Sequence, residues 1–175
     1  MPFISRLYNF FKAKPDYIEY LCARGVKIGE NVHIIDSLID ETYSFLITIG
    51  SNVTITGASV LCHDASTKKP LGYTKIGKVT IGSNVFIGRG SIVLPNTTIG
   101  EGTVIGAGTV VSGNIPPNSV VVGNPCQILC SYEEYLEKHK KRMNESTMIH
   151  KDFNELTKEE MDDISSHING IWYAP

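Results

Sequence analysis

Aliphatic residues recur at every sixth position through the middle of the chain. Six consecutive hexads begin with Ile or Val, and their fifth positions hold small or β-branched residues. The hexads begin at Ile81, Ile87, Val93, Ile99, Ile105 and Val111, and their fifth positions are Val85, Ser91, Thr97, Thr103, Thr109 and Ile115. The same register recurs upstream, in hexads that begin at Ile28, Ile34, Ile49, Ile55 and Leu61.

A period of six fits neither an α-helix, with its period of 3.6, nor a strand that simply alternates. It fits short strands joined by sharp turns, each strand pointing one aliphatic residue into a shared core. Gly at the second position and Gly or Asn at the fourth are predicted to supply turns with positive φ. Three hexads make one triangular turn, and successive turns pair as parallel strands. The sequence therefore predicts an all-β solenoid over residues 28–130, with roughly five turns.

The phase of the repeat slips twice. It slips by three residues between Ile34 and Ile49 and by two residues between Leu61 and Ile81. We expect loops to leave the regular coil at these two places, and the second is the irregular stretch Thr67–Lys75.

Both ends of the chain are predicted to be helical. Residues 1–27 form an N-terminal cap that covers the open end of the solenoid, with helical spacing of Phe3, Leu7, Phe10, Phe11, Ile18 and Leu21 and a start signal at Pro15. Residues 131–175 form a C-terminal extension that begins with a charged helix over Tyr132–Met143. Its basic residues Lys138, Lys140, Lys141 and Arg142 are interpreted as a solvated face or as a coenzyme-phosphate site.

Two further signals lie in the extension. Thr157 and Glu160 form a capping box that opens a final helix ending near Ile168. Trp172 and Tyr173 suggest that the tail docks on a surface.

Composition and charge narrow the function. The formal net charge is −2, which argues against a nucleic-acid partner or an anionic membrane surface. No apolar run approaches the roughly 18 residues of a membrane span, and the N-terminus lacks a signal peptide's long apolar stretch, so a cytoplasmic location is expected. The four cysteines form no C-x-x-C pair, which argues against a zinc site or a disulfide framework.

His63 is the candidate catalytic residue of the repeat. Of the five histidines, only His33 and His63 lie in the repeat. His63 follows Leu61, the expected inward residue, by two positions and lies at or near a turn, which is not an obvious core position. A lone histidine is often structural, and the adjacent Cys62 also invites a Cys–His nucleophile. Adjacent strand residues point to opposite sides, so we do not expect that pair to meet.

The repeat resembles the hexapeptide-repeat acyltransferase superfamily over about 100 of the 175 residues. The likeness is sharpest over Ile81–Ile128. The ending Ile115–Cys126 and the segment Leu61–Ser66 resemble the maltose, galactoside and polysaccharide O-acetyltransferase branch. This resemblance implies a left-handed parallel β-helix, whereas the general preference for right-handed crossovers favours the opposite hand.

The resemblance implies an acetyl-CoA-dependent O-acetyltransferase that acts on a sugar or glycan hydroxyl. It implies a homotrimer with active sites between subunits, and it places the catalytic histidine at His63. A neutral imidazole suits the removal of a hydroxyl proton at pH 7, and the thioester needs no further activation. Asp64 either orients His63, binds an acceptor hydroxyl or forms a turn. Tyr73, in the Thr67–Lys75 loop, is a candidate acceptor-binding residue.

The resemblance also implies a coenzyme site on the later coils. The backbone N–H of Arg89 would face the thioester carbonyl, although Arg89 also reads as an exposed coil residue. Ala107 and Ser112 would follow on the next coil. The branch often carries Arg or Lys at the position of Gln127 to meet the coenzyme 3′-phosphate. Gln127 departs from that pattern, so Lys138 or Arg142 is a candidate substitute.

Two alternatives remain open and three are set aside. A xenobiotic acetyltransferase would share the fold, the histidine and the coenzyme groove, and an inert β-helix scaffold would bind no coenzyme. A zinc carbonic anhydrase on this fold needs three histidine ligands, whereas the repeat holds two, so no metal is expected. Serine acetyltransferases and two-domain sugar-nucleotide N-acetyltransferases would carry a larger N-terminal domain than residues 1–27.

Overall fold

The computed structural model describes residues 15–175, which fall into two compact units divided between Tyr132 and Glu133. The first described element is helix α2 (Pro15–Ala23), which begins at the predicted Pro15 signal. The predicted apolar positions Phe3, Leu7, Phe10 and Phe11 lie outside the described residues.

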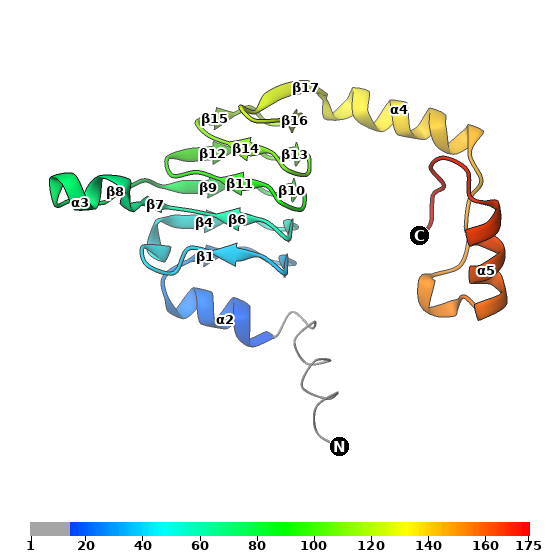
Figure 1. The fold of residues 1–175 in the computed structure, drawn as a ribbon, viewed down its shortest axis with the longest axis horizontal. Helices are drawn as coiled ribbons and strands as arrows, with labels where there is room; N and C mark the ends of the chain where they lie inside the picture. The colour runs from blue at the N-terminus through cyan, green and yellow to red at the C-terminus, as the bar shows by residue number, and fades with distance from the viewer. Residues whose placement is uncertain (1–14) are drawn as a thin grey trace, which may run out of the picture. The chain divides into compact units, whose positions relative to one another are not determined.

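Three parallel sheets form the sides of the first unit (Figure 1). Sheet A contains β1 (Lys27–Ile28), β4 (Ile47–Ile49), β9 (Val79–Ile81), β12 (Thr97–Ile99) and β15 (Asn114–Ile115). Sheet B contains β2 (His33–Ile35), β5 (Thr54–Thr56), β10 (Phe86–Ile87), β13 (Val104–Ile105), β16 (Ser119–Val122) and the antiparallel β17 (Gln127–Ser131). Sheet C contains β3 (Leu38–Ile39), β6 (Ser59–Val60), β11 (Ile92–Val93) and β14 (Val110–Val111). The chain visits A, B and C in turn, so the strands make four coils and two sides of a fifth.

The core is a stack of the aliphatic first positions. Ile81 pairs with Ile49 on one side and with Ile99 on the other, and all three are buried. Small or β-branched fifth positions, such as Thr103 and Thr109, are also buried. Burying each aliphatic side chain contributes on the order of 1.5–3 kcal/mol, which favours this register over a shifted one. The predicted parallel strands are confirmed, and so are the inward first positions of the six consecutive hexads from Ile81 to Val111.

The register differs from the prediction at two corners. Val60, five residues after Ile55, pairs with Val93 and is fully buried, whereas Leu61 is only half-buried. The prediction that Leu61 points inward is therefore wrong. The inward residues Ile55 and Val60 on either side of the corner at Gly57 are five residues apart, one fewer than in a regular hexad. Ile115 likewise pairs with Ile99, so it begins a new side of the coil only four residues after Val111.

Glycine has two different roles in the hexads. Fourth positions such as Asn84 (φ 58°) and Gly90 (φ 75°) adopt positive φ, as predicted. Second positions do not need positive φ. A Cβ at Gly88 would lie 2.8 Å from the backbone nitrogen of Ala107 on the next coil. The prediction for the second position is thus wrong, and close approach of neighbouring coils is what requires glycine there.

Two loops leave the coil where the phase slips. The first follows β3 and contains the short helix η1 (Ser44–Leu46). The second is a hairpin of β7 (His63–Asp64), η2 (Ala65–Thr67), α3 (Lys68–Leu71) and β8 (Lys75–Ile76). Figure 1 shows this hairpin projecting from the stacked strands. Both predicted loop positions are confirmed.

The second unit contains α4 (Tyr132–Glu145), η3 (Phe153–Glu155) and α5 (Lys158–His167). Thr157 and Glu160 form the predicted capping box at the start of α5. The tail docks within this unit, because Tyr173 pairs with Met148 and its hydroxyl shares a 2.9 Å hydrogen bond with His139 Nδ1. None of the helices in residues 15–175 combines the length and apolarity needed to span a membrane.

Candidate active site

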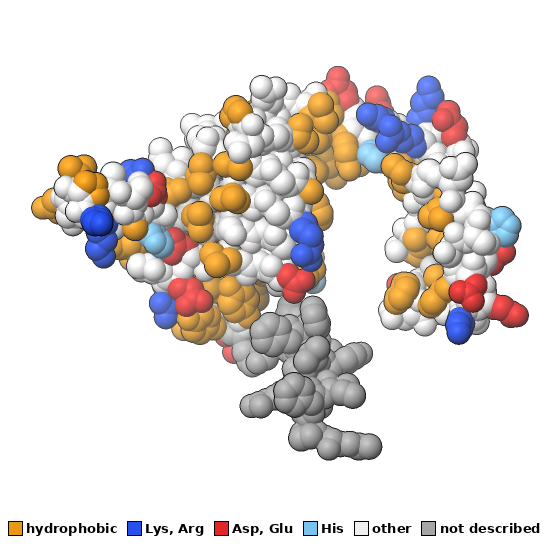
Figure 2. Space-filling model, in the orientation of Figure 1, with side chains coloured by type: hydrophobic (Ala, Val, Ile, Leu, Met, Phe, Trp, Pro, Cys, Tyr) orange, Lys and Arg blue, Asp and Glu red, His pale blue; other side chains and the backbone are white. Residues whose placement is uncertain are grey.

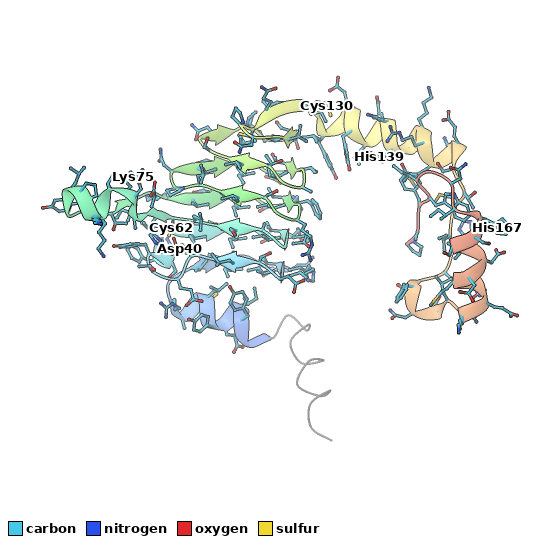
Figure 3. All side chains as sticks on the ribbon, in the orientation of Figure 1. Asp40, Cys62, Lys75, Cys130, His139 and His167 are labelled. Carbon is cyan, nitrogen blue, oxygen red and sulfur yellow. The ribbon has the colours of Figure 1, made fainter. Side chains whose placement is uncertain are left out.

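A histidine and a carboxylate are paired at the base of the projecting hairpin. His63 lies in β7, and its Nδ1 is hydrogen-bonded to Oδ2 of Asp40, which follows β3. The His63 side chain is 30% exposed, whereas the Asp40 side chain is 2% exposed. Figure 3 labels Asp40 near Cys62 at this base, with Lys75 farther out on the hairpin. An accessible imidazole is thus held by a buried acid.

Backbone donors hold Asp40 in its charged form. The Thr42 N–H donates to Oδ1 at 3.0 Å, and the N–H groups of Cys62 and His63 donate to Oδ2 at 3.0 and 3.1 Å. Burial alone would raise the pKa of Asp40, but the hydrogen bonds from Thr42, the His63 ring and Cys62 hold it below its usual value. Because Oδ2 is an acceptor, Nδ1 of His63 carries the hydrogen and Nε2 keeps its lone pair.

The stacking of coils brings these two residues together. Ile39 pairs with Val60, so the residues that follow β3 and β6 lie beside one another. Asp40 was not predicted from the sequence, although the spacing of 21 residues between the first two coils places it next to Leu61. The signal in the sequence was a charged residue, Asp40, directly after the inward aliphatic residue Ile39.

Cys62 is a core residue. Its side chain is fully buried, and Sγ donates to the carbonyl oxygen of Tyr43 at 3.2 Å. Burial and the neighbouring Asp40 carboxylate raise the pKa of the thiol to about 12. The thiol therefore stays protonated at neutral pH, which supports the prediction that Cys62 and His63 do not act as a nucleophile pair.

A cleft of about 480 Å³ opens beside the imidazole. Its apolar walls are Leu61, Ile76, Leu94 and Pro95, and its polar groups are His63, Asp64, Lys75, Asn96 and Ser112. The structure thus brings Ser112, a predicted coenzyme residue, into one cleft with His63. Ser112 follows β14, two coils beyond β6, at the same corner of the coil.

The acceptor candidates Asp64 and Tyr73 are placed differently. Asp64 lines the cleft, pairs with Lys75 at 2.5 Å and accepts from the Ser66 N–H at 2.8 Å. The hydrogen bond from Lys75 and then those from Ser66 lower the pKa of Asp64 to about 2. Asp64 therefore forms the turn into η2, and it is Asp40 that contacts the His63 ring. Tyr73 is 80% exposed on the hairpin and is not among the cleft residues.

Arg89 and Ala107 lie at the amino-terminal ends of the strands of sheet C, opposite the ends that His63 and Ser112 follow. They occupy the corners that precede β11 and β14, and the Arg89 guanidinium pairs with Asp36 at 3.2 Å. His63 and Ser112 lie at the corners that follow the strands of the same sheet. Gln127 is exposed at the start of β17. Within one chain, the predicted coenzyme residues are therefore divided between separate corners.

Comparisons with known proteins identify relatives of the repeat. Residues 78–113 match the family described as "Bacterial transferase hexapeptide (six repeats)". Protein CapG of Staphylococcus aureus is 39% identical over 121 residues, which cover 65% of this chain and 70% of CapG. SAV2555 of S. aureus strain Mu50, named as a candidate acetyltransferase, is 47% identical over 58 residues. That alignment covers 33% of this chain and 29% of SAV2555, so the chain spans under a third of this relative.

Two solved structures share the fold. The hexapeptide-repeat acetyltransferase VCA0836 of Vibrio cholerae O1 biovar eltor, complexed with acetyl coenzyme A, superposes with a TM-score of 0.55 and 27% identity. The match covers 61% of this chain and 60% of that chain. A galactoside acetyltransferase in complex with coenzyme A superposes with a TM-score of 0.52 and 26% identity, covering 74% of this chain and 78% of that one.

Proposed function

The chain belongs to the hexapeptide-repeat transferase family, and from this premise we propose that it is an acetyl-CoA-dependent O-acetyltransferase acting on a sugar or glycan hydroxyl. The observation that carries the proposal is the half-exposed His63 ring on buried Asp40 at an open cleft. The coenzyme in both superposed structures supports acetyl-CoA as donor, and the galactoside acetyltransferase supports a sugar acceptor. Use of acetyl-CoA supports a cytoplasmic location.

The transfer needs one base and no covalent enzyme intermediate. His63 Nε2 takes the proton of the acceptor hydroxyl while the hydroxyl oxygen attacks the thioester carbonyl carbon. The imidazolium that forms is stabilised by the Asp40 carboxylate at Nδ1. When the tetrahedral intermediate collapses, the acetyl ester remains on the acceptor. The C–S bond breaks, and the leaving thiolate takes the proton back from His63 as free coenzyme A.

The coenzyme site is completed by a second chain in this proposal. In the assembly, the corner that carries Arg89 in a neighbouring subunit would lie against the corner that carries His63 in the first subunit. The coenzyme residues and the base would then face one groove between the two chains. The Arg89 backbone N–H would then stabilise the oxyanion, with Ala107, Ser112 and Gln127 along the coenzyme. We further infer a left-handed coil, as the family likeness implies.

An acetyl-transfer assay with free-thiol detection tests the function. We expect acetyl-CoA and a pyranoside acceptor to release coenzyme A, and neither alone to do so. Hydroxylated antibiotics serve as the competing acceptor class. Coenzyme A at 100 times its dissociation constant should also stabilise the fold by about 2.7 kcal/mol. Absence of both thiol release and a thermal shift would leave an inert scaffold.

We expect a trimer in solution, with a mass about three times the 19.2 kDa chain by light scattering. The outer face of sheet C supports this assembly, because Ile92 and Val110 pair as outward aliphatic neighbours and Leu38 lies in the same row beyond Ser59. Ile92→Glu should dissociate the trimer, whereas Thr80→Glu, on the exposed face of sheet A, should not. A wild-type mass of 19.2 kDa at micromolar concentration would contradict the assembly and its shared site.

A further inference from the structure

Two aromatic rings extend from the candidate base towards solvent. The ring centroids of Tyr43 and His63 are 5.7 Å apart, and the planes are inclined by 60°. Phe45 meets Tyr43 edge-on, at 6.4 Å and 69°. Phe45 is 61% exposed. The three rings thus form a continuous line from the imidazole to an open aromatic surface, and hydrophobic side chains gather at this base of the coil beside α2 (Figure 2).

The loop that carries these rings is firmly held. The Thr42 N–H donates to Asp40, and the Leu46 N–H donates to the Tyr43 carbonyl at 2.9 Å. Ser44 Oγ donates to the carbonyl of Arg24 at 2.6 Å, and Arg24 donates to the carbonyl of Glu41 at 2.9 Å. An apolar ring that stays exposed on a rigid loop does not contribute the free energy that its burial would give to folding. A rigid surface of this kind loses little conformational entropy when a ligand binds to it.

The rings and the cleft lie on opposite sides of His63 along the coil axis. Tyr43 and Phe45 belong to the first coil, and His63 leaves the second coil. The cleft residues Leu94 and Ser112 belong to the third and fourth coils. If the donor thioester approaches His63 from the cleft, the side of His63 on which Tyr43 and Phe45 lie remains open to the acceptor.

We propose that Tyr43 and Phe45 form a stacking platform that selects a pyranose ring as the acceptor, an inference that rests on the proposed function. The electron-rich face of Phe45 attracts the polarised C–H groups of a sugar ring's apolar face. A pyranose also carries hydroxyls at the edge of that face, and the proposal requires that a ring bound at Phe45 and Tyr43 present one of them to His63 Nε2. The platform gives Phe45 a role in acceptor selectivity and none in proton transfer.

Steady-state kinetics with a pyranoside acceptor test this platform. We expect Phe45→Ala to raise the acceptor KM about tenfold, while kcat at saturation and the KM for acetyl-CoA stay within about twofold. Phe45→Trp restores a ring face and should restore the acceptor KM. Phe153→Ala is the matched control, because Phe153 is 71% exposed on η3 in the second unit. It should change none of these constants.

Three results would overturn the platform. They are an unchanged acceptor KM in Phe45→Ala, a rise confined to the KM for acetyl-CoA, and a rise confined to aromatic alcohol acceptors. Ligand-observed NMR with a methyl pyranoside and no acetyl-CoA separates this proposal from the proposed function. Binding that is present in the wild type and lost in Phe45→Ala supports the platform even if no coenzyme A is released. Equal binding by the two proteins contradicts it.

Discussion

We expect His63→Ala to lower kcat by roughly 10²–10⁴-fold, the usual contribution of a general base. The loss follows because the part of the chain described by the structure holds no second histidine in the cleft. The affinity for coenzyme A should change little, since His63 is not among the proposed coenzyme-binding residues. Thiol-release kinetics at saturating acceptor measure the first effect, and calorimetric titration with coenzyme A measures the second.

Cys62→Ala is the matched control for the base. Cys62 adjoins His63 in the chain, but its thiol is buried and its pKa is raised to about 12, so most activity should remain. An His63→Ala enzyme that keeps more than about a third of wild-type turnover would place the base elsewhere. His33, on the exposed face of β2, is then the next histidine of the repeat to substitute.

The coil was predictable because its information is local. A buried residue at each first position, as at Ile81 and Ile87, repeats in the sequence itself. The shortened corner at Gly57 was not predictable, because Val60 and Leu61 are both aliphatic and only the pairing of Val60 with Val93 decides between them. The second-position glycines were misread for a related reason. Their constraint comes from the next coil, as the contact between Gly88 and Ala107 shows.

The site was predictable only in part. His63 was proposed as the base chiefly from the resemblance of Leu61–Ser66 to the O-acetyltransferase branch, and the sequence offered its neighbour Asp64 as an orienting group. Coil stacking instead places Asp40, 23 residues earlier, against the ring. Which residues meet between coils depends on the number of residues in each turn of the coil. That number cannot be read from the repeat where its phase slips, and Asp40 and His63 both lie at such places. The roles of Arg89 and Ala107 stay predictions, since one chain keeps them at the far end of sheet C.

Asp40→Asn should lower kcat by roughly 10²–10⁴-fold, because a neutral amide neither stabilises the imidazolium nor fixes the Nδ1–H tautomer. The amide also places an NH₂ group against a backbone donor, either Thr42 N–H or those of Cys62 and His63. Asp40 acts through His63, so the double variant Asp40→Asn/His63→Ala should be no slower than His63→Ala alone. A tenfold further loss in the double variant would show that Asp40 acts on the reaction by another route.

Asp40→Asn should also change how stability depends on pH. The folded state holds the pKa of Asp40 below its unfolded value, which is about 3.9. The stabilisation from the charged carboxylate is therefore fully present above that unfolded pKa and is lost as pH falls through the folded pKa. Wild type should exceed Asp40→Asn in unfolding free energy at pH 7 and at pH 5, and the gap should narrow near pH 3. Urea unfolding at the three pH values measures it, and a gap that widens between pH 5 and pH 3 would refute a charged Asp40 beneath His63.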